Sequence, residues 1–153
     1  MAGFVIRRAA AADFDALQQI YRRAALSNPG DRAGLLAHPE FLRLDDDLVG
    51  RGRTWVATTT DDDTVVGFAA TSRVNDDVLE LDDLFVDPDW RRRGAARQLI
   101  ERIMKEAVAE RATSIEVTGN THAMSFYRAV GFTSETRVAT PLGTGTRMRK
   151  QIT

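Results

Sequence analysis

VDPDWRRRGAARQLI, residues 86–100, leads from a strand end through a proline turn into a helix that we predict to start at Gly94. The first N–H groups of a helix have no intrahelical partners and carry the positive end of the helix dipole. Gly94 and the small Ala95 and Ala96 let a ligand approach this backbone closely. The arginines before Gly94 can neutralise the remaining charge of a phosphate. The segment is therefore typical of a main-chain anion site, and equally of an arginine-rich, solvated helix start.

Two familiar phosphate motifs are missing from this segment. It contains neither the P-loop pattern GxxxxGK[ST] nor the dinucleotide pattern GxGxxG. ATP and dinucleotides are therefore disfavoured as the polyanion.

The composition of the chain excludes several classes of protein. With 153 residues, 43% of them hydrophobic, the chain suits one globular domain over residues 1–153. Its 21 Lys and Arg nearly balance its 22 Asp and Glu, whereas a protein held to nucleic acid by counterion release is usually strongly basic. Cysteine is absent, and the two histidines, His38 and His122, are far apart in sequence, so we expect neither disulfides nor a metal site.

Targeting signals are also missing from the sequence. No run approaches the ~18 apolar residues of a membrane span. The N-terminal sequence MAGFVIRRAAAADF lacks the long apolar core of a signal peptide. We therefore expect a cytoplasmic protein with no membrane partner.

Hydrophobic periodicity predicts an α/β (α+β) chain in the order β-α-α-β-β-β-α-β-α-β-β. The clearest helix carries an apolar stripe that runs from Leu99 to Val108. The step from strand 78–86 through this helix to strand 114–119 should be a right-handed crossover, so the sheet is mixed. The predicted strands are 4–8, 53–60, 64–74, 78–86, 114–119, 132–138 and 146–152, and the predicted helices are 12–27, 35–49, 94–111 and 120–130.

Turn residues separate these elements. Pro29 and Gly30 break the first helix, and Asp61–Asp63 indicates a hairpin turn. Gly131 is the expected C-cap of the last helix, and PLGTG, residues 141–145, is the expected turn between the last two strands.

Two short patterns resemble those of the GNAT superfamily of acyl-CoA N-acyltransferases. Arg91-x-x-Gly94-x-Ala96 matches the signature Q/R-x-x-G-x-G/A, in which the backbone amides hold the pyrophosphate of acetyl-CoA. Ala96 stands where a second glycine is commoner, and its methyl group keeps the phosphate slightly farther from the backbone. The segment NTHAMSFYRAVGF resembles the pattern N-x-x-A-x-x-F/Y-Y…GF through Asn120, Ala123, Phe126, Tyr127, Gly131 and Phe132.

The resemblance implies a GNAT fold, with a mixed central sheet of about seven strands flanked by about four helices. It implies an acetyltransferase that moves the acetyl group of acetyl-CoA, its co-substrate, directly to a primary amine of a small molecule or a protein, without a metal. The main chain of Leu84, Phe85 and Val86 would pair with the pantetheine arm. Asn120 would bind the pantetheine or the loop beside it. The pyrophosphate turn would comprise Arg91, Arg92, Arg93, Gly94, Ala95, Ala96 and Arg97.

Acetyl transfer to an amine needs a base for the amine and a proton for the leaving thiolate. The resemblance places Tyr127 near the thioester sulfur, where its phenol can act as the general acid. Glu80 lies six residues before Val86, similar to the base glutamate of histone-type family members, and we rank it first as the base, followed by Asp82 and Glu116. In a regular strand Glu80 and Asp82 share one face.

Other interpretations remain open at this point. The same fold could serve as a non-catalytic acyl-CoA sensor, or the arginines could form a nucleic-acid patch, although interleaved aromatics and further basic clusters are missing. The acceptor amine is not identified, and we expect Ser27–Gly52 and Pro141–Gly145 to line its pocket. Monomer and homodimer are both compatible with the sequence.

Overall fold

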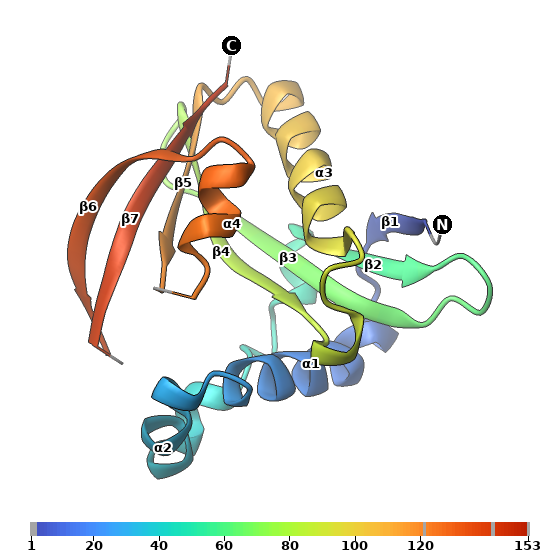
Figure 1. Cartoon of the computed structure of the whole chain (residues 1–153). Helices are drawn as coiled ribbons and strands as arrows, with labels where there is room; N and C mark the ends of the chain where they lie inside the picture. The colour runs from blue at the N-terminus through green and yellow to red at the C-terminus, as the bar shows by residue number, and fades with distance from the viewer. Residues whose placement is uncertain (1–2, 121, 142, 153) are drawn as a thin grey trace. The chain divides into compact units, whose positions relative to one another are not determined.

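The computed structural model describes residues 3–120, 122–141 and 143–152 (Figure 1), and its elements follow the predicted order. The strands are β1 (Phe4–Arg8), β2 (Thr54–Thr59), β3 (Val65–Arg73), β4 (Val78–Val86), β5 (Ser114–Gly119), β6 (Thr133–Thr140) and β7 (Gly143–Gln151). The α-helices are α1 (Phe14–Leu26), α2 (Pro29–Ala37), α3 (Ala95–Ala109) and α4 (Met124–Ala129).

The strands form one sheet in the order β1-β2-β3-β4-β5-β7-β6. The pairs β1–β2, β2–β3, β5–β7 and β6–β7 are antiparallel, whereas β4 and β5, joined through α3, are parallel. The prediction of a mixed, seven-stranded sheet is therefore confirmed. The chain groups into two compact units, and each is described by itself: unit 1 comprises residues 3–70 and 83–99, and unit 2 comprises the described residues of 71–152 outside 83–99.

The core of unit 1 forms between α1 and its strands. Leu17 and Ile20 recur at helical spacing along α1, and both are almost completely buried. They pack in one cluster with Val56 of β2 and with Phe68 and Ala70 of β3. Burial of these apolar side chains fixes the face that α1 turns to the sheet.

Unit 2 has its core on one face of β4, β5 and β7. Leu79, Leu81, Ile115, Val117 and Met148 alternate with polar residues along these strands, and each is at most 2% exposed. Side chains at alternate positions of a strand share one face, so the polar residues between them share the opposite face. The long hairpin of β6 and β7, orange to red in Figure 1, extends this part of the sheet.

The position of the second helix was predicted wrongly. The sequence favoured a helix over residues 35–49, but α2 spans Pro29–Ala37. Pro29 occupies the first turn of α2, where its fixed φ suits a helix and its missing N–H costs nothing, so the same residue that separates α1 from α2 also starts α2. Beyond α2 the chain forms only short 3₁₀ turns before β2.

Several predicted boundaries also need correction. Helix α4 is shorter than the predicted 120–130, and the strands β6 and β7 extend farther toward each other than predicted, so Gly143–Gly145 lies within β7 rather than in a turn. Leu142, part of the predicted PLGTG turn, lies outside the described residues. Val108 was assigned to the apolar stripe of α3, but it is 59% exposed.

Gly131 was predicted as the C-cap of α4, but the C-cap is Val130, and Gly131 is the left-handed residue that follows it. Its φ of 100° lies in the left-handed region that glycine tolerates best. The N–H of Gly131 donates to the carbonyl of Arg128 at 3.0 Å, and the N–H of Phe132 donates to the carbonyl of Tyr127 at 2.9 Å. These two bonds form a Schellman motif, which satisfies the last carbonyls of the helix.

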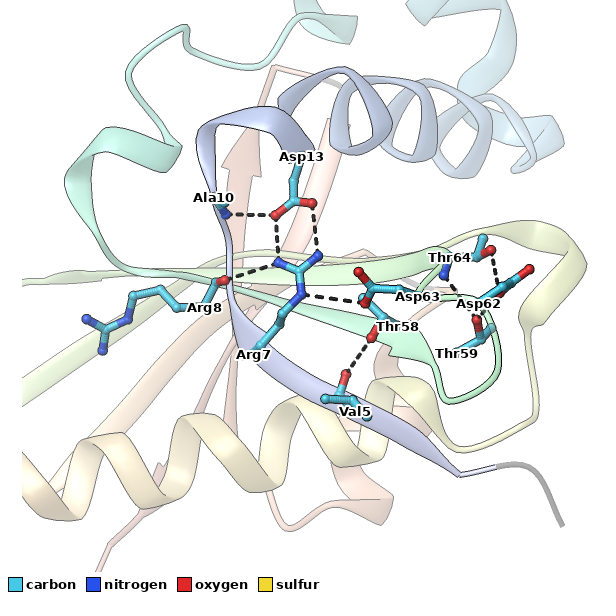
Figure 2. Close-up of polar contacts among 10 residues, drawn as sticks. All are labelled: Val5, Arg7, Arg8, Ala10, Asp13, Thr58, Thr59, Asp62, Asp63 and Thr64. Atoms are coloured by element: carbon cyan, nitrogen blue, oxygen red, sulfur yellow. Dashed lines mark hydrogen bonds and ion pairs between the residues drawn. The ribbon is translucent and has the colours of Figure 1, made fainter.

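An ion pair ties β1 to the start of α1 within unit 1 (Figure 2). Two nitrogens of Arg7 donate to Asp13 at 2.8 and 3.1 Å, and the N–H of Ala10 donates to the same carboxylate at 2.7 Å. Asp63 lies 3.8 Å from Nε of Arg7. The hydrogen bond from Arg7 holds the pKa of Asp13 below its ordinary value, against the opposing effect of burial.

The predicted hairpin turn at Asp61–Asp63 is confirmed. The hydroxyls of Thr59 and Thr64 donate to the carboxylate of Asp62 at 2.5 and 2.8 Å (Figure 2). The N–H of Thr64 donates to the hydroxyl of Thr59 at 3.0 Å. The N–H of Thr59 also donates to the carbonyl of Thr64 at 2.9 Å, so side-chain and backbone bonds together stabilise the turn.

Candidate active site

The turn that follows β4 belongs to unit 1 and is fastened to α1. The carboxylate of Asp87 caps a 3₁₀ turn over Pro88–Trp90 by accepting from the N–H of Asp89 at 2.9 Å, and the N–H of Trp90 donates to the carbonyl of Asp87 at 2.8 Å. Arg23 of α1 binds both carboxylates, that of Asp87 at 2.6 Å and that of Asp89 at 3.1 Å. The chain therefore reaches the arginine-rich segment from a fixed starting point.

The backbone of the arginine-rich segment has the conformation of an anion site. Arg92 and Gly94 both lie in the left-handed region, with φ of 63° and 93°. The N–H of Gln98 donates to the carbonyl of Gly94 at 3.0 Å and is the first of the α3 ladder. The amides of residues 95–97 thus precede the ladder, and such amides are the donors that bind anions at a helix start. A left-handed residue beside helical ones also turns successive N–H groups toward one side.

Two arginines of this segment are occupied by contacts within unit 1. Nη2 of Arg91 donates to the hydroxyl of Ser27 at 2.5 Å. The guanidinium of Arg93 lies 4.8 Å from the ring centroid of Trp90, a cation–π distance. Both side chains therefore stabilise the turn itself.

Arg92 and Arg97 differ from these two. Both side chains are exposed, and among the residues that the structure describes neither has a hydrogen-bond or ion-pair partner. Arg92 lies three residues before these amides, and Arg97 is the last of the three residues that supply them. Arg92 and Arg97 are therefore the side chains best placed to meet the charge of an anion bound there.

The end of β4 extends beyond the register that it shares with β5. That register pairs Val78–Leu81 of β4 with Ser114–Val117 of β5, and Leu84, Phe85 and Val86 follow it. On the β3 side, a Cβ at Gly67 would approach the carbonyl oxygen of Phe85 to 2.9 Å, so only glycine allows this close packing. The three residues predicted to pair with pantetheine thus lie where β4 has left the shared register.

Tyr127 is positioned by packing within unit 2. It is 6% exposed, and its ring makes edge contacts with Phe126 and Phe132 at centroid distances of 5.6 and 5.4 Å. A Cβ at Gly119, the last residue of β5, would lie 3.1 Å from this ring. Because Gly119 has no side chain, the ring of Tyr127 can pack directly against the end of β5.

Asn120 supports the start of α4. Its carboxamide oxygen accepts from the N–H of Ala123 at 3.0 Å, and its carbonyl oxygen lies 3.1 Å from the same nitrogen. This contact to the adjoining loop is one of the two roles that the sequence suggested for Asn120.

The carboxylates ranked first and third as the base lie side by side in unit 2. Glu80 of β4 and Glu116 of β5 are directly opposite in the parallel register. Arg147 of β7 donates to both oxygens of Glu80, at 2.5 Å through Nη1, and to Glu116 at 3.0 Å. Arg147 also donates to the hydroxyl of Thr118 at 3.1 Å, and Arg149 binds Glu116 at 2.8 Å. The hydrogen bond to Glu80 is the main cause of a raised pKa at Arg147.

Sequence reasoning did not find Arg147 and Arg149. The alternation Arg147-Met148-Arg149, with a buried methionine between two arginines, could have placed both side chains on one face of a strand. Their pairing with Glu80, 67 residues away, depends on the order of strands in the sheet, which the pattern alone does not specify.

The other acidic residues of β4 continue the predicted alternation for one more position. Asp82 is exposed on the face of Glu80, whereas Leu79 and Leu81 are buried on the other. From Asp83 onward the burial no longer alternates. Asp82 and Glu80 thus share a face, as predicted for a regular strand.

The predicted acceptor segment, Ser27–Gly52, is held to α1 by two side chains that sequence reasoning also missed. Gln18 donates to the carbonyl of Leu42 at 2.6 Å and accepts from the N–H of Leu44 at 2.9 Å. The hydroxyl of Tyr21 donates to the carbonyl of Phe41. These bonds satisfy backbone groups of an irregular segment and fix its path over α1.

The described residues offer neither a membrane-spanning helix nor a metal site. None of the helices there has the length and apolar character needed to cross a bilayer. No group of three or more His, Cys, Asp or Glu within the same residues could hold a metal ion.

Comparisons with known proteins agree with this geometry. The model of the acetyltransferase (GNAT) family matches residues 14–132. A peptidyl-lysine N-acetyltransferase of Salmonella typhimurium is 31% identical over 127 residues, which cover 83% of this chain and 81% of that protein.

Two solved structures share the fold. The PaiA N-acetyltransferase of Thermoplasma acidophilum, in complex with coenzyme A, has a TM-score of 0.79 at 17% identity, covering 97% of this chain and 99% of that chain. YncA of Salmonella typhimurium, a putative acetyltransferase with its cofactor acetyl-CoA, has a TM-score of 0.71 at 22% identity, covering 99% and 95%.

Proposed function

The chain belongs to the GNAT family of acetyltransferases, and on that premise we propose that it transfers the acetyl group of acetyl-CoA to a primary amine. The observation that carries the proposal is the turn before α3, with left-handed Arg92 and Gly94 and free first-turn amides. The lysine activity of the relative at 31% identity favours a lysine side chain of a protein or peptide as the acceptor. A small-molecule amine is the second candidate.

The residues of the turn fit a pyrophosphate. The amides of residues 95–97 would donate hydrogen bonds to it, and the exposed guanidiniums of Arg92 and Arg97 would meet its remaining charge. The open space at Gly94, where a Cβ would meet only Gln98 at 3.9 Å, leaves the backbone accessible. The main chain of Leu84 to Val86 would pair with the pantetheine arm, because β4 has left its register with β5 there.

Two side chains of unit 2 would carry the proton transfers. When bound, acetyl-CoA supplies an activated acetyl group. We assign to Tyr127 the donation of a proton to the leaving sulfur, since a phenol can protonate a thiolate. We assign to Glu80 the acceptance of the proton from the amine, directly or through water, with Asp82 and Glu116 as the next candidates. The hydrogen bonds from Arg147 to both oxygens of Glu80 fix the orientation of that carboxylate.

The alternatives make different demands on the same residues. A nucleic-acid patch would use all the arginines before α3, yet Arg91 and Arg93 are committed to Ser27 and Trp90. An acyl-CoA sensor would bind the same ligand without turnover. The acetyltransferase proposal therefore depends on measured catalysis rather than on binding alone. We further propose that the chain acts in the cytoplasm as a single domain over residues 1–153.

The test combines binding with turnover. Acetyl-CoA at ~100 times its dissociation constant should stabilise the folded protein by about 2.7 kcal/mol, whereas ATP and NAD should stabilise it much less. Release of free thiol from acetyl-CoA should then depend on an added amine, assayed first with a peptide that has one internal lysine and then with a panel of small amines. Binding without amine-dependent thiol release would favour a sensor, and the lack of both heat and thermal shift would refute the assignment of acetyl-CoA.

A further inference from the structure

Four charged side chains form a ladder across three strands of unit 2. We call the charge ladder the set Glu80, Glu116, Arg147 and Arg149. Glu80 and Glu116 are only 19% and 18% exposed in their side chains, and Arg147 is 30% exposed. Partly buried charges are costly unless each is paired, and here two carboxylates meet two guanidiniums. Solubility alone does not explain charged side chains that are paired and partly buried in this way.

The geometry gives Arg147 a special place in the charge ladder. Its fork binds both oxygens of Glu80, which fixes the plane of that carboxylate, and it also binds Glu116 and Thr118. Arg149, two residues away on the same strand, binds only Glu116 among the described carboxylates. Arg147 is thus the residue that connects β7 to the carboxylate ranked first as the base.

Glu80 and Glu116 lie opposite each other on neighbouring strands, and without Arg147 their carboxylates would lose the guanidinium that binds both. Like charges at such positions repel, and the flexible side chain of Glu80 would turn away from Glu116. A displacement of a reacting group by ~1 Å can cost about a hundredfold in rate. The loss of Arg147 should therefore harm catalysis through Glu80, even though Arg147 itself need not touch either substrate.

We propose that Arg147 is a positioning residue that orients the Glu80 carboxylate for proton transfer, an inference that rests on the proposed role of Glu80. The C-terminal hairpin thereby contributes to the reaction through a bidentate contact rather than through a reacting group. A merely structural role would instead lower the stability of the protein and leave the effects of the two residues independent.

A double-mutant cycle separates these possibilities. The variants are Arg147→Met, Glu80→Gln and their combination, assayed by thiol release with acetyl-CoA and the single-lysine peptide. Arg147→Met should lower kcat by about 10–100-fold and change KM for acetyl-CoA by less than about twofold. In the Glu80→Gln background the same change should cost less than about twofold, because the residues act as a unit. Arg149→Met is the matched control and should keep most of the wild-type kcat.

A conservative variant keeps the test independent of folding. Arg147→Lys retains the charge without the fork, so it should fold and recover part of kcat in the wild-type background, with no effect in the Glu80→Gln background. Losses that multiply in the double variants would overturn the inference. So would a fully active Glu80→Gln enzyme, although acetyl transfer itself would then stand. Failure of the wild type to release thiol with any amine would instead refute the proposed function.

Discussion

Replacing Gly94 by valine tests whether the main chain or the arginines hold the anion. The φ of 93° at Gly94 is a genuine outlier for a β-branched residue and should cost about 1–3 kcal/mol. A Cβ there meets nothing closer than Gln98 at 3.9 Å, so the Cβ itself fits and the positive φ is the cause of the strain. Rotation of the peptide would relieve the strain, but it would also turn the first-turn amides away from the ligand.

The binding constants should separate the two contributions. Since ~1.4 kcal/mol corresponds to a tenfold change, Gly94→Val should raise the Kd for CoA by about 5–140-fold. Arg92 is exposed, and an exposed charge contact contributes about 0.2–1 kcal/mol, so Arg92→Ala should raise the Kd by about 1.4- to fivefold. Calorimetric titration with CoA measures both values. Gly30→Val, at a glycine with ordinary φ and open surroundings, is the control and should leave the Kd unchanged. Equal losses, or a larger loss at Arg92, would refute the main-chain site and favour binding by charge alone.

Three further predictions concern the proton transfers and the stability of unit 1. Tyr127→Phe keeps the ring contacts with its neighbours and should lower kcat by about 10–1,000-fold with CoA affinity intact, as expected when a general acid is lost; full activity would mean that the thiolate leaves unassisted. Glu80→Gln should show a defect that shrinks as the pH rises toward ~9, because more of the amine is already neutral, whereas Tyr127→Phe should show no such rescue; a defect independent of pH would move the base to another carboxylate or to ordered water. Asp13→Asn should reduce the free energy of unfolding by about 1–3 kcal/mol at pH 7, and its melting temperature by ~2–4 °C for each kcal/mol. Because the pKa of Asp13 is lowered in the folded state, its contribution is present above the ordinary value of 3.8 and is lost as the pH falls through the folded value. The gap in melting temperature between wild type and Asp13→Asn should therefore close in acid, and a gap that stays constant would contradict the ion pair with Arg7; Asp46→Asn, at an exposed residue, is the control.

The order of elements could be predicted because each element carries its own local pattern. Strands β4 and β5 show alternation with a period of two, and α1 shows apolar residues at helical spacing. The end of α4 was predictable because Gly131 directly follows the helical segment, and glycine is the residue that most easily adopts the left-handed conformation after a helix. These signals lie within a few residues of the feature that they specify.

The errors share a different origin. Pro29 separates two helices and also starts the second one, and the sequence has no local signal that distinguishes these roles. Arg147 was missed as a partner of Glu80 because the contact joins β7 to β4 across β5, and the insertion of β7 between β5 and β6 is a property of the whole sheet. Pairings that depend on strand order lie beyond periodicity and motif spacing.

A net charge of −1 is compatible with binding a polyanion because the structure divides the arginines by role. Arg91 and Arg93 stabilise the turn, and Arg147 and Arg149 neutralise carboxylates. Beside the turn, the guanidiniums of Arg92 and Arg97 remain to meet an anion. Backbone amides carry no net charge, yet at a helix start they bind anions through aligned dipoles. A site built in this way needs glycine and small residues at particular φ values more than it needs basic residues. The φ of 93° at Gly94 is therefore a more informative feature than the three arginines that precede it.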